Sequence, residues 1–377
     1  MYKLTVENSD ILGSINKFFK SLLREELVDV LLLPQRSPQG EFAIPSLVKN
    51  ETELKEADPF IPFLLLNSAS LLSQLTIDNP KSKIGAVMRS CEIRAAVELS
   101  KLKQINWENV IIIGVDCLGT YEPRDYKQMS KDFKEGKEIT REFISACQDG
   151  KANPVKGASL RTACQACEYP APENFDIALN FIGCNIDKEI FIQASERIEG
   201  EKLKKAGLSL AEDNSCWSKA VESLRQERKI FQDKLTADTL AQTKEIKDFL
   251  KALEGCRRCD NCRRACPICY CRECIFDSLV FEHESSQYMR WAEKRGKIRM
   301  PADTLLFHLT RMNHMVISCV GCGQCTSACP NDIPVAKFFK TVGAGVQELF
   351  TYQPGKNRDE EIPQSTFKED EFAQVGK

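Results

Sequence analysis

The segments CRRCDNCRRACP (residues 256–267) and CVGCGQCTSACP (residues 319–330) decide how the C-terminal part of this chain folds. Each segment contains four cysteines in the spacing C-x2-C-x2-C-x3-C, followed directly by a proline. Three thiolates separated by two residues each can bind three corners of one iron–sulfur cube, while the fourth, set apart by the extra residue and the proline, crosses to a second cube. The two segments therefore predict one module with two [4Fe-4S] clusters.

This doubled spacing is typical of bacterial-type ferredoxins with two clusters, and chance would rarely produce both copies with the trailing proline. Zinc is the alternative, because four thiolates also suit a tetrahedral site, but paired C-x2-C segments would be enough for zinc. The crossing pattern predicts the ligands. Cluster one is expected to be bound by Cys256, Cys259, Cys262 and Cys329, and cluster two by Cys266, Cys319, Cys322 and Cys325.

The 52 residues between Cys266 and Cys319 include DTLLFHLTRMNHMVIS, which has the composition of a helix and favours the helical variety of this module. Its histidines, His308 and His314, could lie beside a cluster or ligate it, although ordinary packing is the simpler interpretation. Three further cysteines follow the first segment directly and could hold an extra metal, with Cys184 or Cys216 as a distant fourth ligand, or could be buried thiols. They are Cys269, Cys271 and Cys274.

The composition supports metal binding over disulfides. The chain has 377 residues, 18 of them cysteine, with 42% apolar residues, 28% charged residues and a net charge of −2. That length is enough to bury ordinary cores, so a disulfide-stapled miniprotein is excluded. No signal peptide and no apolar stretch long enough for a membrane span is visible, which predicts a cytoplasmic protein whose thiols stay reduced. The near-neutral, interspersed charge argues against nucleic-acid binding.

The N-terminal part has the pattern of an α/β domain. Residues 84–88 (IGAVM) and 110–115 (VIIIGV) are short apolar runs typical of buried strands, and residues 92–104 between them have apolar positions at helical spacing. This order predicts a parallel βαβ unit. Further strands are expected at residues 28–33, 177–182 and 190–193.

Four cysteines of this domain fall where a parallel sheet would gather them. Cys91 and Cys117 each follow one of the two predicted strands directly, at the edge where open α/β sheets bind their ligands. Cys164 and Cys167 form a C-x2-C pair in a turn-rich segment. A four-thiolate site is one interpretation; four unrelated thiols, or a zinc site, is the other. Cys147, Cys184 and Cys216 are expected to be structural.

Arg89, Glu92 and Arg94 surround Cys91, at the expected start of a helix. Arginines in that position can bind phosphate, and a solvated salt-bridge cluster is an equally good interpretation. No G-x-G-x-x-G joins a strand to a helix, and no phosphate-binding G-x-x-x-x-G-K-[ST] occurs. Neither G-x-S-x-G nor H-E-x-x-H is present, so nothing indicates hydrolysis.

These residues together resemble a family. MRSCEIRAAVELSKLKQINWENVIIIGVDCLGTY and RTACQACEYPAPENFDI are similar to the beta subunits of deazaflavin-coenzyme-reducing hydrogenases and formate dehydrogenases. CRRCDNCRRACPICYCREC, FHLTRMNHMVISCVGCGQCTSACP and FTYQPGKNRDEEIP resemble the formate dehydrogenase branch most. The resemblance covers roughly residues 80–365.

The resemblance implies an iron–sulfur flavoprotein that carries FAD. It matches Cys91, Cys117, Cys164 and Cys167 to the cysteine motifs of the flavin-bearing domain, which favours a third cluster there, with FAD near the Cys91 segment and Arg89, Glu92 and Arg94 as candidate contacts. Four parts are then expected. They are an α/β flavin- and cluster-binding domain (residues 1–195), a helical connector (196–254), a dicluster ferredoxin domain (255–345) and an extended, partly disordered arm (346–377).

We therefore expect an electron-transfer subunit of a formate dehydrogenase-like oxidoreductase, with no catalytic acid or base of its own. A flavin converts between one-electron and two-electron carriers. The partner would be a catalytic formate dehydrogenase or hydrogenase subunit, or a heterodisulfide-reductase-type complex, and the acceptor the deazaflavin coenzyme, NAD(P) or another redox protein. The alternatives are a flavin-free polyferredoxin adaptor and a zinc-stabilised interaction protein.

Overall fold

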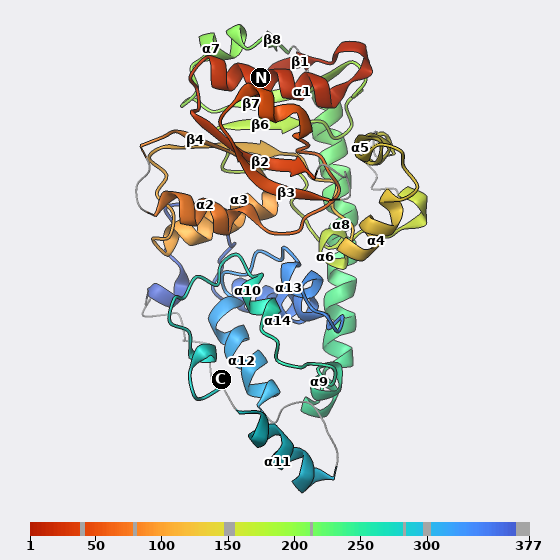
Figure 1. Cartoon of the computed structure of the whole chain (residues 1–377), viewed down its shortest axis with the longest axis vertical. Coiled ribbons are helices and arrows are strands. Elements are labelled where there is room, and N and C mark those ends of the chain that lie inside the picture. The colour runs from red at the N-terminus through yellow and green to blue at the C-terminus, as the bar shows by residue number, and fades with distance from the viewer. Residues whose placement is uncertain are drawn as a thin grey trace.

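The computed structural model describes residues 1–37, 42–77, 81–146, 155–211, 214–281, 284–296 and 303–366. The molecule is elongated, with a β-sheet and its helices at one end and a group of helices and loops at the other (Figure 1). One long helix, α8, runs beside both parts (Figure 1). Within the described residues, no helix combines the length and apolar character needed to cross a membrane.

The sheet has eight strands in the order β3-β2-β4-β5-β6-β7-β1-β8. Its centre, β2-β4-β5-β6, is parallel, and the outer pairings are antiparallel. The expected βαβ unit is confirmed: β4 and β5 pair in parallel and helix α3 lies between them in sequence. The strands are β1 (Tyr2–Thr5), β2 (Val30–Arg36), β3 (Ala43–Val48), β4 (Ile84–Arg89), β5 (Val110–Val115), β6 (Ile177–Asn180), β7 (Glu189–Ala194) and β8 (Ser209–Leu210).

Helices cover both faces of the sheet, because the apolar side chains of β4 and β5 point both ways and each face needs a partner. On one face lies α1 (Ile11–Arg24), whose Ile15, Phe18 and Phe19 belong to the larger core. On the other lie α2 (Ser68–Thr76) and α3 (Ser90–Lys101), which face the C-terminal helices (Figure 1). Their core continues into that part through Ile268 and Val320.

The middle of the chain is helical apart from β8. The 28-residue helix α8 (Ser215–Gln242) packs against α6 (Thr162–Gln165) and α14 (Val335–Leu349), so it contacts both ends of the molecule. The expected connector thus contains α8 together with α7 (Gly200–Lys205) and α9 (Ile246–Ala252). The sheet itself reaches Leu210, past the boundary expected at residue 195, because β8 pairs with β1.

The C-terminal part holds its own apolar core around Phe276, Phe281, Phe307, Phe338 and Phe339, and several of the clustered cysteines pack against this core. Its helices are short where the cysteines lie and longer elsewhere. The remaining α-helices in the described ranges are α4 (Pro123–Ser130), α5 (Gly136–Ser145), α10 (Asn261–Arg264), α11 (Ser285–Arg295), α12 (Thr304–Met315) and α13 (Gln324–Ser327).

The C-terminal arm packs on the protein. Helix α14 ends at Leu349, past the domain boundary expected at residue 345, and the chain up to residue 366 lies on the protein with Tyr352 and Ile362 buried. The arm has little apolar sequence, yet buried charged groups on α3 bind it, and these partners could not be inferred from its composition. Residues 367–377 lie outside the described residues.

Candidate iron–sulfur centres

The four thiols expected to bind cluster one lie together. Cys256, Cys259, Cys262 and Cys329 line a common cavity, and His308 also lines it. The charges of Cys259, Cys262 and Cys329 all act on Cys256. Cys329 comes from the second cysteine segment, so the chain crosses between the segments as the spacing requires.

Donors surround these thiols. Arg311 Nη1 lies 3.1 Å from Cys262 Sγ, and the backbone N–H of Arg258 lies 3.4 Å from Cys256 Sγ. His308 Nε2 lies 3.4 Å from Cys256 Sγ, so this histidine is a neighbour of cluster one. Burial and then the charge of Arg311 lower the pKa of His308 to about 4, which leaves the ring neutral. Donors aimed at cluster sulfurs raise the reduction potential, because they favour the more negative reduced state.

The thiols expected to bind cluster two also lie together. The charges of Cys266, Cys319 and Cys322 all act on Cys325. Two glycines in the segment have positive φ angles, Gly321 (69°) and Gly323 (78°), and the backbone amides of Gly321 and Gln324 donate toward Cys319 and Cys322. A left-handed conformation at these positions favours glycine.

The structure also brings together Cys91, Cys117, Cys164 and Cys167, which we call the cluster-three thiols. Cys91 is in the first turn of α3 directly after β4, and Cys117 follows β5. Cys164 is in α6 and Cys167 follows it. The charges of Cys117 and Cys167 act on Cys91, and that of Cys164 acts on Cys117. The group therefore sits at the carboxyl edge of the parallel strands, where sequence reasoning placed it.

The environment of the cluster-three thiols is buried and positively charged. Burial raises the pKa of Cys117 to about 11, against the opposing effect of Arg89 and Arg228. Burial acts on Cys164 in the same direction, but Arg161 and the Thr120 hydroxyl outweigh it, and the pKa is lowered. Thiolates buried in this way need a positive partner, and both the arginines and a bound cluster would supply it.

Sequence reasoning missed three of the arginines that surround the thiols. Arg228, on α8, donates to the carbonyls of Cys117 (3.3 Å), Cys167 (3.4 Å) and Leu118 (2.7 Å). Arg161 lies 3.5 Å from Cys164 Sγ, and Arg311 has been described above. Arg228 stands in a highly charged helical stretch, where nothing distinguishes a buried arginine from an exposed one. Arg161, three residues before Cys164, was the one a spacing argument could have found.

The cluster-two and cluster-three thiols adjoin each other. Cys322 is the shared neighbour, because its charge acts on Cys91 and the charge of Cys164 acts on it. Gly323 lies against Ala163, and a Cβ added to Gly323 would stand 2.5 Å from the Ala163 Cβ. The three thiol groups therefore follow one another in the order one, two, three, and cluster two lies between the others.

The three residues expected to contact FAD have partners within the chain. Arg89 donates to the carbonyls of Phe63 and Ile61, and Glu92 accepts from the backbone N–H groups of Ser68 (2.9 Å) and Arg89 (3.0 Å). Arg94 donates to two carbonyls as described below. All three are buried. Their bonds hold the start of α3 in place, and FAD binding by these residues stays a prediction.

The cysteines outside the three thiol groups lie at two separate places in the described residues. Cys269, Cys271 and Cys274 lie near one another, with Arg311 and Arg263 close to Cys269. Cys184 and Cys216 adjoin each other beside Asp116 in the N-terminal part, so the structure does not support either as a fourth ligand to that trio. Nowhere in the described ranges do three His, Cys, Asp or Glu side chains converge on a point for a single metal ion.

His314 is exposed, on the far end of α12. Cys147, which sequence reasoning took as structural, lies outside the described residues, as does His283.

A mixed β-sheet covered by helices and joined to a helical module with two ferredoxin-type cysteine segments places the chain in the class of iron–sulfur redox proteins. Comparison with known proteins supports this class. Residues 252–333 match the family model described as a 4Fe-4S dicluster domain. The chain is 30% identical over 369 residues to the F420-dependent formate dehydrogenase subunit beta of Methanocaldococcus jannaschii, covering 91% of each chain.

A second relative is the F420-dependent formate dehydrogenase 1 subunit beta of Methanococcus maripaludis, 29% identical over 385 residues and covering 95% of this chain and 94% of the relative. The chain belongs to the family of formate dehydrogenase beta subunits. A solved structure of the F420-reducing [NiFe] hydrogenase complex from Methanosarcina barkeri matches 65% of this chain and 93% of its own, at 14% identity and a TM-score of 0.45. That likeness is too weak to carry an argument.

Proposed function

We propose that this chain carries electrons through three [4Fe-4S] clusters between a catalytic formate-oxidising subunit and a hydride acceptor. The observation that carries the proposal is the row of three four-thiol groups, in which Cys322 of cluster two neighbours both Cys91 and Cys164 of cluster three. Four thiolates are the usual ligand set of a cubane cluster. A row of such clusters provides one-electron steps from one end of the chain to the other.

The protein's own side chains hold and tune these clusters. Arg311 lies next to cluster one, and Arg161 and Arg228 next to cluster three. Their charges offset the negative charge of thiolate-bound clusters and stabilise the reduced state of each. In this proposal no side chain serves as an acid or base, because the residues around the thiols donate hydrogen bonds and do not transfer protons.

The exposed end of the row indicates where electrons enter. Cys259 of cluster one is exposed, whereas the cluster-three thiols Cys91, Cys117 and Cys164 lie deeper between the sheet and α8. We therefore place the catalytic partner at the cluster-one end and the acceptor at the cluster-three end. The named relatives are dependent on the deazaflavin coenzyme F420, which makes that coenzyme our first choice of acceptor, ahead of NAD(P) or a heterodisulfide-reductase-type complex.

A groove beside cluster three has the chemistry that a flavin requires. Leu160, Leu224 and Phe231 supply apolar surface, and Arg228 and Lys234 supply positive charge. Arg228 also contacts the carbonyls of Cys117 and Cys167, so the groove adjoins cluster three. We propose this groove for FAD in place of the Arg89–Arg94 segment. A flavin supplies conversion between single electrons and a hydride.

The proposal is tested by purifying the tagged chain, with the subunits it binds, from its own cells under anoxic conditions. Formate is then added and the visible cluster absorption is followed. We expect formate to bleach the absorption, and the deazaflavin coenzyme to restore it. Clusters that dithionite reduces but formate does not would contradict the formate-linked role.

Two variants, each with a matched control, sharpen the test. Cys322→Ser, in the middle of the row, should stop transfer from formate to the coenzyme, while Cys184→Ser, outside the three groups, should not. Phe231→Ala should lower the FAD released by acid, and Leu240→Ala, an exposed position on the same helix, should leave it unchanged. A wild-type complex that releases no FAD would instead support the flavin-free adaptor.

A further inference from the structure

Arg94 lies where the sheet domain meets the C-terminal cluster-binding part, a boundary that we call the joint. It is 7% exposed, and its Nη1 donates to the carbonyl of Val320 at 3.1 Å while its Nε donates to the carbonyl of Pro354 at 3.0 Å. The guanidinium also stacks on Tyr169, 3.7 Å from the ring centre. Val320 lies between the cluster-two thiols Cys319 and Cys322, and Tyr169 lies two residues after the cluster-three thiol Cys167. One side chain thus contacts both cluster segments.

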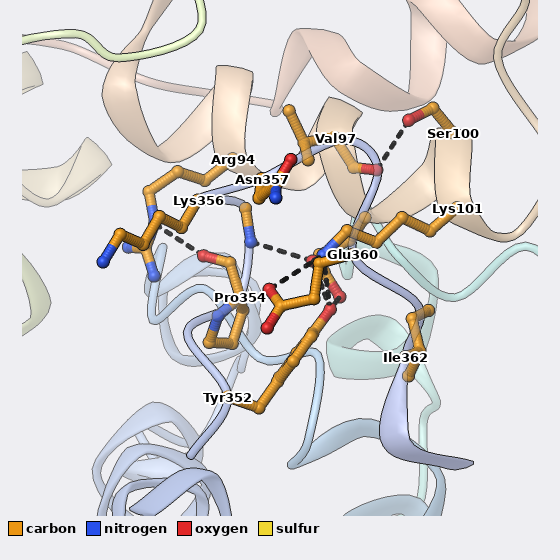
Figure 2. Close-up of polar contacts among 12 residues, drawn as sticks. Arg94, Val97, Ser100, Lys101, Tyr352, Pro354, Lys356, Asn357, Glu360 and Ile362 are labelled. Atoms are coloured by element: carbon orange, nitrogen blue, oxygen red, sulfur yellow. Dashed lines mark hydrogen bonds and ion pairs between the residues drawn. The ribbon is translucent and has the colours of Figure 1, made fainter. Parts of the chain in front are cut away.

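The C-terminal arm is anchored one turn further along α3, at Glu98. Figure 2 shows the hydroxyl end of Tyr352, from the arm, and the Lys101 side chain of α3 pointing toward one another. The Glu98 carboxylate is fully buried and accepts from the Tyr352 hydroxyl (2.7 Å), the Gly355 N–H (2.8 Å) and Lys101 Nζ (3.1 Å). Two of the three donors therefore come from the arm, more than 250 residues away in the chain. A buried carboxylate is stable only while such donors stay in place.

At Gly355 the backbone of the arm lies directly against the backbone of α3. Its φ is +75°, and an added Cβ would stand 2.4 Å from the Arg94 Cβ and 2.5 Å from its Cα. Beyond it, Asn174 Nδ2 donates to the carbonyls of Gly355 (3.1 Å) and Lys356 (2.8 Å). Arg358 donates to the Asn174 carbonyl at 3.0 Å. The arm therefore follows a single fixed path over the joint.

Two further contacts cross the joint, one from each part of the molecule. Lys340 of α14 donates to the carbonyl of Ala166, between Cys164 and Cys167. Arg161 Nη1 donates to Ser327 Oγ at 3.2 Å, between Cys325 and Cys329. Each part thus donates hydrogen bonds to a cysteine segment of the other. Arg94 is the residue among these that also contacts the arm.

We infer that the arm segment Tyr352–Glu360 is a strap that fixes the separation of clusters two and three, and that Arg94 and Glu98 are positioning residues for electron transfer between them. The inference rests on the proposed third cluster. Electron transfer depends steeply on the separation of the carriers, so the bonds of Arg94, Arg161 and Lys340 across the joint keep the rate constant by fixing the separation of the two cluster segments. The strap touches no cluster; it acts through Arg94 on the two cluster segments.

The test compares two glycine variants of the full chain. Gly355→Ala puts a Cβ against Arg94 and must lift the strap. Gly207→Ala has a similar positive φ of 84° but no atom within 4 Å of the added Cβ, so it adds the same backbone strain without a clash. Iron and sulfide content, the magnetic coupling between reduced clusters in EPR spectra, and the rate at which electrons reach cluster three are measured in each.

We expect Gly355→Ala to keep its iron, to lose the coupling between clusters two and three, and to transfer electrons roughly tenfold more slowly. Gly207→Ala should match the wild type. Full iron with unchanged coupling and rate in Gly355→Ala would overturn the strap and leave the proposed function intact. A wild-type chain with only eight irons would instead overturn the third cluster, and the strap with it.

A second variant keeps the inference testable if Gly355→Ala does not fold with its clusters. If Gly355→Ala purifies without its full iron, Tyr352→Phe repeats the comparison, because it keeps the ring over Lys101 and removes only the hydroxyl bound to Glu98. Weaker coupling at full iron content supports the strap, and wild-type coupling refutes it.

Discussion

Replacing Arg228 by methionine tests the electrostatic part of the account. The side chain is 4% exposed and lies beside Cys117, whose pKa its charge lowers. Methionine keeps most of the apolar stem and removes the charge. At an effective dielectric constant of about 20 and a separation of roughly 7 Å, one unit charge contributes about 2 kcal/mol, or roughly 100 mV for a one-electron couple. The reduction potential of cluster three should therefore fall by about that much.

The same change removes three hydrogen bonds to buried carbonyls. The shortest, to Leu118, is 2.7 Å long, and the two to Cys117 and Cys167 are longer. Loss of a charged donor to such groups should lower the free energy of unfolding by about 3 kcal/mol. The control is Arg225→Met on the same helix, because the Arg225 side chain is 42% exposed and its ion pair with Glu222 spans 3.6 Å. That variant should change stability by less than about 0.5 kcal/mol.

The assay is a redox titration of the full chain followed by EPR, with denaturant unfolding measured in parallel. Only one of the three midpoint potentials should move in Arg228→Met, and none in Arg225→Met. An equal fall in all three potentials, or no fall in any, would refute the placement of Arg228 beside a distinct third cluster.

Three further predictions concern the C-terminal module. Arg311→Met removes the donor to Cys262 and a charge that also acts on Cys266 and Cys325, so it should lower the potentials of clusters one and two and leave that of cluster three unchanged; a shift in cluster three instead would contradict the assignment. Phe307→Ala should lower the free energy of unfolding by about 3–5 kcal/mol in denaturant titrations, since the ring is 1% exposed, whereas Leu306→Ala, at 53% exposed, should cost little. Removing iron with a chelator should expose the amides of residues 256–274 and 319–333 to hydrogen exchange, while the sheet stays protected. The reason is that four-residue helices such as α10 and α13 cannot persist alone. If these amides stay protected after iron removal, the clusters do not stabilise the two segments.

The central strands and the spacing of the dicluster cysteines were accessible to sequence reasoning, because both depend on short-range patterns. The run at residues 110–115 forms β5 with those same bounds, and the run at 84–88 forms β4 with one residue more. Cys91 and Cys117 were placed at one sheet edge by a rule about parallel strands, and they lie there. Their role as ligands stays a prediction.

The long-range parts were not accessible. Strand β1 pairs with β7 and β8, which lie almost 190 and more than 200 residues further along the chain. The four residues of β1 carry no pattern that would identify these partner strands. The arm illustrates the same point, because its polar composition indicates exposure while its donors are bound by the buried Glu98. Arg89, Glu92 and Arg94 were selected for phosphate chemistry, and the structure shows each bonded to the chain itself.

The measurement that tests the central claim most directly is the iron and acid-labile sulfide content of the full chain purified without oxygen, compared with Cys117→Ser. Three clusters predict about 12 iron atoms per wild-type chain and about 8 in the variant. A wild-type value of about 8 that Cys117→Ser leaves unchanged would contradict the account, because only the dicluster module would then carry metal.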